Sequence, residues 1–167
     1  MSTCLEDYAL IGDCETAALV SRGGSIDWLC WPRFDSPACF AALLGTPEHG
    51  RWLLEPVASG ARITRKYRDR TLILETTMET VDGTVTVVDF MPPRGRNSDI
   101  VRLVRGERGR VRMHTELVLR FDYGRTVPWV THLDDGTYRA IAGPKFLTRV
   151  ETVNDSGELV SSTILRR

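Results

Sequence analysis

The sequence predicts an all-β fold, an antiparallel β-sandwich with one short helix. Short apolar or β-branched runs, separated by turn residues, recur along the whole chain, as is typical of a sandwich. Residues 110–123 alternate with a period of two, which indicates a strand with one core face and one wet face. The predicted core face holds Val111, Met113, Thr115, Leu117, Leu119, Phe121 and Tyr123; the wet face holds Arg112, His114, Glu116, Val118, Arg120 and Asp122.

The remaining expected strands are short and lie between turn signals. Gly23-Gly24 and Asp82-Gly83 are strong hairpin signals, because tight turns favour residues that tolerate positive φ. The sequence predicts about a dozen strands in all. Besides the alternating segment they are Tyr8–Ile11, Ala17–Ser21, Ile26–Trp31, Arg51–Glu55, Ile63–Tyr67, Thr71–Val81, Thr84–Met91, Ile100–Arg105, Trp129–Leu133, Thr137–Ala142, Phe146–Val153 and Leu159–Leu165.

The one predicted helix has Ala38–Leu44 as its body. Asp35 or Ser36 is a suitable N-cap, Pro37 fits the first turn, and Gly45 is a suitable stop. This helix follows the expected strand Ile26–Trp31, which Pro32 ends because proline has no N–H to donate to a sheet.

Length and charge indicate a single domain, residues 1–167, with a sizeable core. Lys plus Arg and Asp plus Glu number 22 each, and this balance argues against nucleic acid or an anionic membrane as the main partner. No apolar run approaches the roughly 20 residues that a membrane-spanning helix needs. The first eight residues hold two acids and no basic residue, unlike a signal peptide, so we expect a cytoplasmic protein.

The cysteines and histidines do not predict a metal site. Cys4, Cys14, Cys30 and Cys39 include no C-x-x-C pair, and the three histidines have no ligand spacing. We therefore expect no metal and no cofactor. Cys30 and Cys39 are interpreted as small buried hydrophobic residues.

The junction between the strand and the predicted helix is the candidate site. Residues 31–35 present two aromatic rings, a guanidinium and a carboxylate, which are groups that sugar sites use. The candidate substrate or interdomain contacts are Trp28, Trp31, Arg33, Phe34 and Asp35. A purely structural interpretation stays open, in which the rings pack in the core and Arg33 pairs with Asp35.

Several sequence blocks together resemble the N-terminal domain of bacterial glycoside hydrolase family 15 proteins, the glucoamylase- and trehalase-like group. They extend from about Tyr8 to Pro144, and the blocks DWLCWPRFDSPACFAALL and RFDYG are specific in combination. The blocks are residues 8–13, 16–22, 24–44, 48–52, 88–93 and 116–124.

This resemblance implies a β-sandwich that precedes a catalytic (α/α)6 barrel. The barrel would supply the two carboxylates that hydrolyse an α-glucoside with inversion, and nothing in this chain resembles it. Residues 155–167 do not look like the family's usual continuation, so we expect the sandwich to lack its C-terminal strands. Open sheet edges would then favour a homo-oligomer.

Three hypotheses for function follow. In the first, the chain is an accessory domain that packs on the barrel and shapes the mouth of its active site. The second is a free-standing carbohydrate-binding or protein-interaction module, for which no aromatic row is evident. The third, hydrolysis by this chain alone, is disfavoured because acids such as Asp134 and Asp135 sit in a turn signal, and turn acids are normally solvated.

Overall fold

The computed structural model describes residues 4–95, 98–134, 137–142, 147–150 and 163–165. Within them the chain forms fourteen strands and three short 3-10 helices. In order these are η1 (Leu5–Asp7), β1 (Tyr8–Gly12), β2 (Ala17–Ser21), β3 (Ser25–Cys30), β4 (Ala38–Phe40), η2 (Ala42–Leu44), η3 (Pro47–His49), β5 (Arg51–Pro56), β6 (Arg62–Tyr67), β7 (Leu74–Glu79), β8 (Gly83–Phe90), β9 (Val101–Gly109), β10 (Met113–Val118), β11 (Trp129–His132), β12 (Tyr138–Ile141), β13 (Leu147–Val150) and β14 (Thr163–Leu165).

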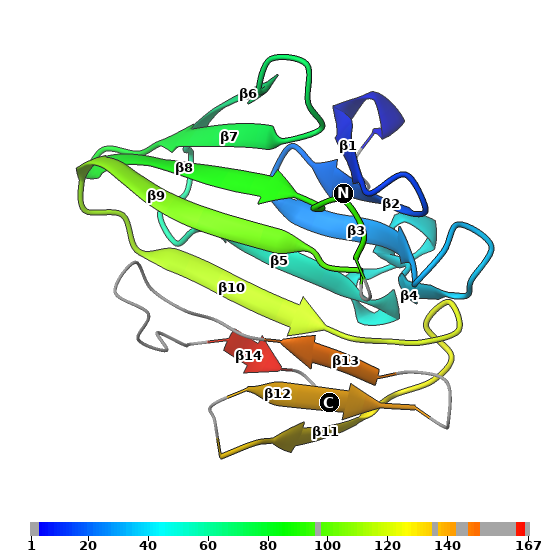
Figure 1. Ribbon diagram of the computed structural model, residues 1–167. Coiled ribbons are helices and arrows are strands. Elements are labelled where there is room, and N and C mark those ends of the chain that lie inside the picture. Colours follow the sequence, from blue (N-terminus) through cyan, green and yellow to red (C-terminus); the bar gives the residue numbers. More distant parts are fainter. Residues whose placement is uncertain (1–3, 96–97, 135–136, 143–146, 151–162, 166–167) are drawn as a thin grey trace.

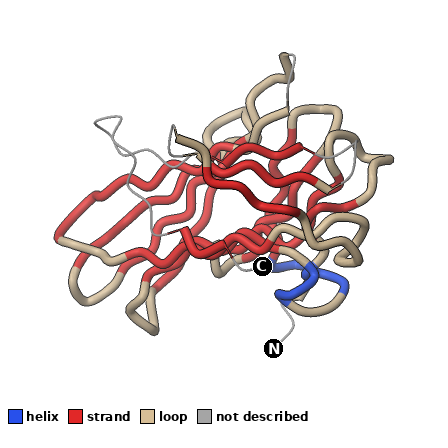
Figure 2. Tube along the Cα trace, turned by 90° about the horizontal axis from the view of Figure 1, so that it is seen from below, coloured by secondary structure: helices blue, strands red, loops and turns tan. Residues whose placement is uncertain are grey.

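The strands form three sheets, and the predicted all-β sandwich is confirmed (Figure 1). The first sheet has the order β1-β2-β3-β5-β10-β14, with β4 also paired to β3. The second has the order β6-β7-β8-β9, and the third β11-β12-β13. All described pairings are antiparallel except β10 with β14. The strands run along the long axis, with hairpin tips at one end and longer loops at the other (Figure 2).

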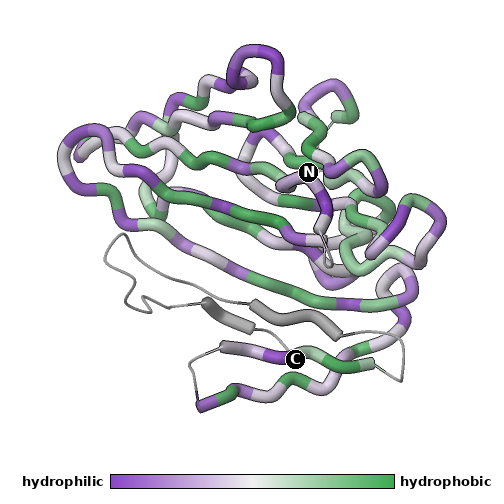
Figure 3. Tube along the Cα trace, viewed as in Figure 1, coloured by the Kyte–Doolittle hydropathy of each residue, from purple (hydrophilic) through white to green (hydrophobic). Residues whose placement is uncertain are grey.

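The core lies between the first two sheets. One cluster joins Leu54 of β5 to Met78, Val85 and Val87 of the second sheet. A larger cluster includes Ile26, Leu74, Leu117, Phe121 and Ala140, which come from all three sheets. In Figure 3 the hydrophobic stretches follow the paired strands, whereas the hairpin tips are hydrophilic. Burial of these alternate side chains is the main force that holds the sheets together.

A buried ion pair also links the two large sheets. Arg102 on β9 binds Asp89 on β8 at 2.8 Å, and both side chains are 1% exposed. The same guanidinium donates to the carbonyl oxygens of Trp52 at 2.6 Å and of Gly24 at 2.7 Å, and it lies 5.4 Å from the ring centre of Trp52. A charge buried to this extent requires such partners.

The prediction of a helix with the body Ala38–Leu44 is wrong. Residues 38–40 form β4, and residues 42–44 form only the turn η2. Leu29 and Phe40 are paired across β3 and β4, while the N–H groups of Ala41 and Ala42 donate to the carbonyl of Gly50. These long-range partners outweigh the local helix propensity of an alanine- and leucine-rich segment.

The prediction for residues 110–123 is correct in part. Strand β10 occupies only Met113–Val118, and Leu117, Leu119 and Phe121 are buried as expected. The supposed wet face is wrong, because Glu116, Val118 and Arg120 are buried as well. Glu116 pairs with Arg51 of the neighbouring strand β5 at 2.7 Å. The N–H of Arg120 donates to the carbonyl of Cys39 on β4, so this segment is bonded to strands on both sides.

Candidate functional site

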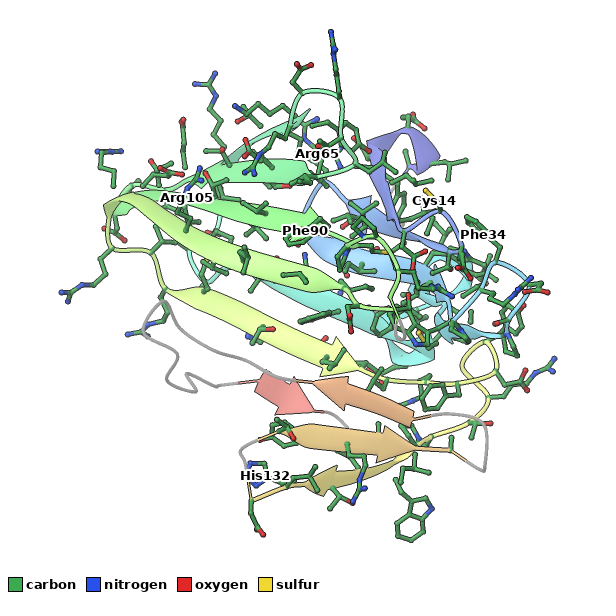
Figure 4. The ribbon with its side chains drawn as sticks, viewed as in Figure 1. Cys14, Phe34, Arg65, Phe90, Arg105 and His132 are labelled. Atoms are coloured by element: carbon green, nitrogen blue, oxygen red, sulfur yellow. The ribbon has the colours of Figure 1, made fainter. Side chains whose placement is uncertain are left out.

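Four loops project from the same end of the sandwich, to the right in Figure 1. They follow β1, β3, β8 and β10, and their described residues are 13–16, 31–37, 91–95, 98–100 and 119–128. We call this the loop end. Figure 4 shows Cys14 and Phe34 there, well away from Arg105 on the second sheet. The five predicted site residues lie on β3 and the loop that follows it.

Strand β3 places the two candidate tryptophans at the edge of the core. Trp31 is half-buried and packs against the larger core cluster. Trp28 is also half-buried, and its ring centre lies 6.1 Å from that of Tyr123. The peptide bond between Trp31 and Pro32 is cis. The structural interpretation therefore describes the tryptophans well, because both contribute mainly to packing.

Arg33, Phe34 and Asp35 are exposed instead. The side chain of Phe34 is 63% exposed, although phenylalanine is usually buried. Arg33 Nε lies 3.0 Å from Asp35 Oδ1. The hydrogen bond from Arg33 lowers the pKa of Asp35, and Asp35 raises the pKa of Arg33. Together these three residues, which we call the corner, present a ring beside a neutralised pair of charges.

The backbone of the corner is tied to its neighbours. The N–H of Phe34 donates to the carbonyl of Glu15 at 3.0 Å. The N–H of Ser36 donates to the carbonyl of Arg33, whose own N–H donates to Ser36 Oγ. These bonds hold the backbone beneath the exposed ring in place before any partner binds, so less backbone entropy is lost on binding.

Arg94 connects three of the loops, and sequence reasoning missed it. Its guanidinium binds Asp13 through Nε at 3.0 Å and Nη2 at 2.9 Å, and Glu15 through Nη1 at 2.9 Å. Nη2 also donates to the carbonyl of Pro32, directly before the corner, and to Ser98 Oγ. A signal existed, because Asp13 ends the block 8–13 and Arg94 follows the block 88–93.

Asp13 is buried beneath this network. Burial alone would raise the pKa of Asp13, but hydrogen bonds from Ser98, from the N–H groups of Thr16 and Glu15 and from Arg94 lower it to about 2. The carboxylate is therefore ionised across the physiological range, and it can bind Arg94 throughout. Its role is to hold the loops together rather than to transfer protons.

The two most specific sequence blocks meet beside the corner. The N–H of Tyr123 donates to the carbonyl of Ala38 at 3.2 Å. Gly124 has a φ of +92°, and a Cβ atom there would lie 2.9 Å from Cδ2 of His49. The block around residues 120–124 therefore supports the start of β4, the strand that follows the corner loop.

The buried carboxylates of the described residues have partners within the fold. Each of the four buried carboxylates in the described residues accepts hydrogen bonds from a cation or from hydroxyl groups. Asp13 binds Arg94, Asp27 binds Tyr8 and Ser25, Asp89 binds Arg102, and Glu116 binds Arg51. These contacts tie all four carboxylates into the fold. Within the described ranges no cluster of His, Cys, Asp and Glu is suited to a metal ion.

A surface hollow of about 490 Å³ lies elsewhere, between β1, β6, the start of β7 and Arg22 in the β2–β3 turn. Its guanidinium groups serve the fold. Arg22 donates to the carbonyl of Ile63, and Arg65 donates to those of Asp7 and Val20. Because these bonds join the edges of the first two sheets, the hollow has a structural explanation. The described part of the chain has no helix that meets the length and hydropathy of a membrane span.

Known proteins are similar to this chain over the region that contains these sequence blocks. The model of the trehalase-like N-terminal family matches residues 1–145. A trehalase of Mycolicibacterium smegmatis is 42% identical over 87 residues, 52% of this chain and 13% of that protein. A trehalase of Mycobacterium tuberculosis is 39% identical over 104 residues, 62% of this chain and 15% of that protein.

An archaeal relative extends the similarity. Trehalase 1 of Sulfolobus acidocaldarius is 34% identical over 132 residues, 79% of this chain and 22% of that protein. The matches to these three proteins thus cover 13–22% of their length. No solved structure matches the chain significantly. The resemblance to the N-terminal domain of trehalase- and glucoamylase-like glycoside hydrolases is confirmed, and the chain belongs to the trehalase-like N-terminal family.

Proposed function

We propose that this chain is the accessory domain of a trehalase-type glucoside hydrolase, and that it packs on the catalytic part through the corner. The observation that carries the proposal is the exposed ring of Phe34 on a backbone that Glu15 and Arg94 hold in place. An exposed aromatic side chain on a fixed backbone is suited to anchor a protein interface. In this role the catalytic (α/α)6 barrel supplies the acid and the base, and the corner shapes the mouth of its active site.

The polar part of the corner fits the same role. Arg33 and Asp35 are exposed side by side, so their remaining donors and acceptors are available to sugar hydroxyls or to the barrel. Trp28 and Trp31 support the loop from the core side. The substrate class would be an α-glucoside, with trehalose as the first to test, since the relatives are named trehalases.

A fusion protein tests this proposal. The matched N-terminal part of the Mycolicibacterium smegmatis trehalase is replaced by this chain, and kcat/KM for trehalose is measured. We expect Phe34→Ala and Arg33→Ala each to lower kcat/KM by about tenfold, equivalent to about 1.4 kcal/mol. The matched control is Val81→Ala, at a residue that is 95% exposed in the β7–β8 hairpin. Unchanged turnover and unchanged stability in the corner variants would contradict the proposal.

A titration distinguishes the accessory domain from a free-standing carbohydrate-binding module. The chain by itself is titrated with trehalose, maltose and a soluble glucan, and tryptophan fluorescence is recorded. The accessory-domain proposal predicts no saturable change, because the sugar site requires the catalytic part. Saturable binding that is lost in Phe34→Ala would favour a free-standing carbohydrate-binding module.

A further inference from the structure

We infer that the docking surface extends beyond the corner to an apolar row on β11, on β12 and in the loop just before β11, and that the catalytic part of the longer protein covers this row. The row consists of Val127, Trp129 and Ile141. The inference rests on the proposed function for the identity of the partner. It adds a second contact area, which the corner does not require, and it therefore has a test of its own.

Trp129 is the clearest sign of a missing partner. Its side chain is 85% exposed, and Ile141 is 39% exposed. The two residues are paired directly across β11 and β12, so their side chains are neighbours on the same face. Val127 is exposed two positions earlier. Tryptophan is enriched where protein interfaces are fully buried, and isolated exposed residues would not form such a row.

The opposite face of the same sheet is already covered. Val130 and Ala140 form the next pair; Ala140 is buried in the larger core cluster, and Val130 packs against it. Around this pair the small sheet is thus apolar on both faces, and this pattern is typical of strands that are covered on both sides. Among the described residues, only the inner face, with Val130 and Ala140, is packed against other parts of the chain.

The loop that holds Tyr123 connects the surroundings of the corner to the row. Tyr123 is exposed, contacts Trp28, and donates its N–H to Ala38 at the end of the corner loop. The loop that holds Tyr123 leads directly into β11, whose first residue is Trp129. In Figure 1 this start of β11 and the end of β12 both lie at the loop end. One partner can therefore reach the corner and the row together.

Two further observations favour the catalytic part as the occupant. The matched region is only 13–22% of the length of the relatives, so the longer proteins hold ample chain to cover it. Because such a catalytic part would be linked covalently to this domain, tethering raises its effective concentration at the row. Arg139 is exposed on the same face, opposite Thr131, and it would complement a carboxylate of the partner.

Hydroxyl-radical footprinting with mass spectrometry tests the inference. The labelling rates of Trp129, Phe34 and Val81 are compared between the free chain and the fusion protein described above. We expect the rate at Trp129 to fall by at least about fivefold in the fusion protein, as in the buried centre of an interface. Val81, at the opposite end of the sandwich, should be labelled equally in both proteins.

The result separates the two proposals. If Phe34 is protected in the fusion protein while Trp129 is not, the apolar row is not an interface and this inference is overturned, whereas the corner proposal stands. If neither is protected, both fail. Concentration-dependent protection of Trp129 in the free chain would also overturn the inference, because a second copy would then be the occupant.

A substitution gives an independent measurement. In the fusion protein, Trp129→Ser should lower the protection of Ile141 and leave the labelling of Val81 unchanged. Since Trp129 contributes little to the folded chain itself, the free chain with Trp129→Ser should unfold at the same temperature as the original. Equal protection of Ile141 in both fusion proteins would contradict the inference.

Discussion

At the scale of single residues, Arg94 and Asp13 determine the geometry of the corner. Neither touches the exposed ring of Phe34, yet Arg94 binds the carbonyl of Pro32 directly before it. Asp13 in turn fixes Arg94 and the turn of residues 13–16. The corner thus depends on residues about 20 and 60 positions away in the chain, and these residues lead to a pH prediction.

Asp13→Asn should destabilise the chain in a pH-dependent way. The pKa of Asp13 is about 2 in the folded chain, against an ordinary value of 3.8. Its ionised form therefore adds about 2 kcal/mol to the free energy of unfolding above pH 4, and this contribution disappears as the pH falls from about 4 to 2. Urea unfolding of both proteins at pH 7 and at pH 2.5 measures it. A difference that is the same at both pH values would contradict the assignment.

Gly24 should not tolerate a side chain. Its φ is +87°, and a Cβ atom would lie 2.3 Å from the carbonyl oxygen of Leu54. Gly24→Ala is therefore expected to cost about 3 kcal/mol in strain and overlap. Gly60 is the matched control, since its φ is +78° and nothing lies within 4 Å; Gly60→Ala should cost about 1 kcal/mol. Thermal unfolding of both variants measures the difference. Equal losses of stability would mean that overlap with the carbonyl of Leu54 does not add to the cost at Gly24.

At the scale of elements, the strands were predictable and some of their partners were not. Alternation and hairpin signals place β1, β2, β3 and β5–β8 within three residues of their observed bounds. Strand β9 continues four residues beyond the predicted end, through Gly106 and up to Gly109. The largest error is β4, because its strand conformation depends on pairing with β3. The local sequence of residues 38–40 does not indicate that they will pair with β3.

The buried pair between Arg102 and Asp89 should be essential for joining the sheets. Arg102→Met leaves the carboxylate of Asp89 and two carbonyl oxygens without their donor. We expect a loss of about 3–5 kcal/mol in the free energy of unfolding. Adding Asp89→Leu should recover part of this loss, because no unpaired charge is then buried. Chemical denaturation of the single and double variants tests this, and additive losses would contradict it.

At the scale of the whole molecule, the chain is a scaffold that presents one rigid end. The exposed corner could be located from sequence because an Arg, an Asp and two aromatic rings follow a strand that ends at a proline. Its supports could not, since Asp13, Arg94 and Ser98 are brought together only by folding. Trp129 was visible in the sequence, but its exposure depends on the pairing of β11 with β12.

The purified chain alone should not hydrolyse trehalose. The buried carboxylates of the described residues hold cations or hydroxyl groups, so none is placed to act as a general acid. Glucose release is measured with a coupled assay, with the Mycolicibacterium smegmatis trehalase as the positive control. Activity that co-purifies with the chain through several columns, and that persists after Phe34→Ala, would contradict the accessory role.

The side chain of Tyr67 has a consequence for solubility. Its hydroxyl group accepts from the N–H of Leu10 and donates to the carbonyl of the same residue, on β1, the outermost strand of its sheet. A foreign strand approaching that flank finds these main-chain groups already occupied. Strand β9 forms one edge of the second sheet. Its pairing with β8 has a register shift between Thr84 and Val85 of β8, and β9 has an exposed pair of Arg105 and Glu107. Such features discourage edge-to-edge aggregation. Both edges are therefore less open to pairing with a foreign strand.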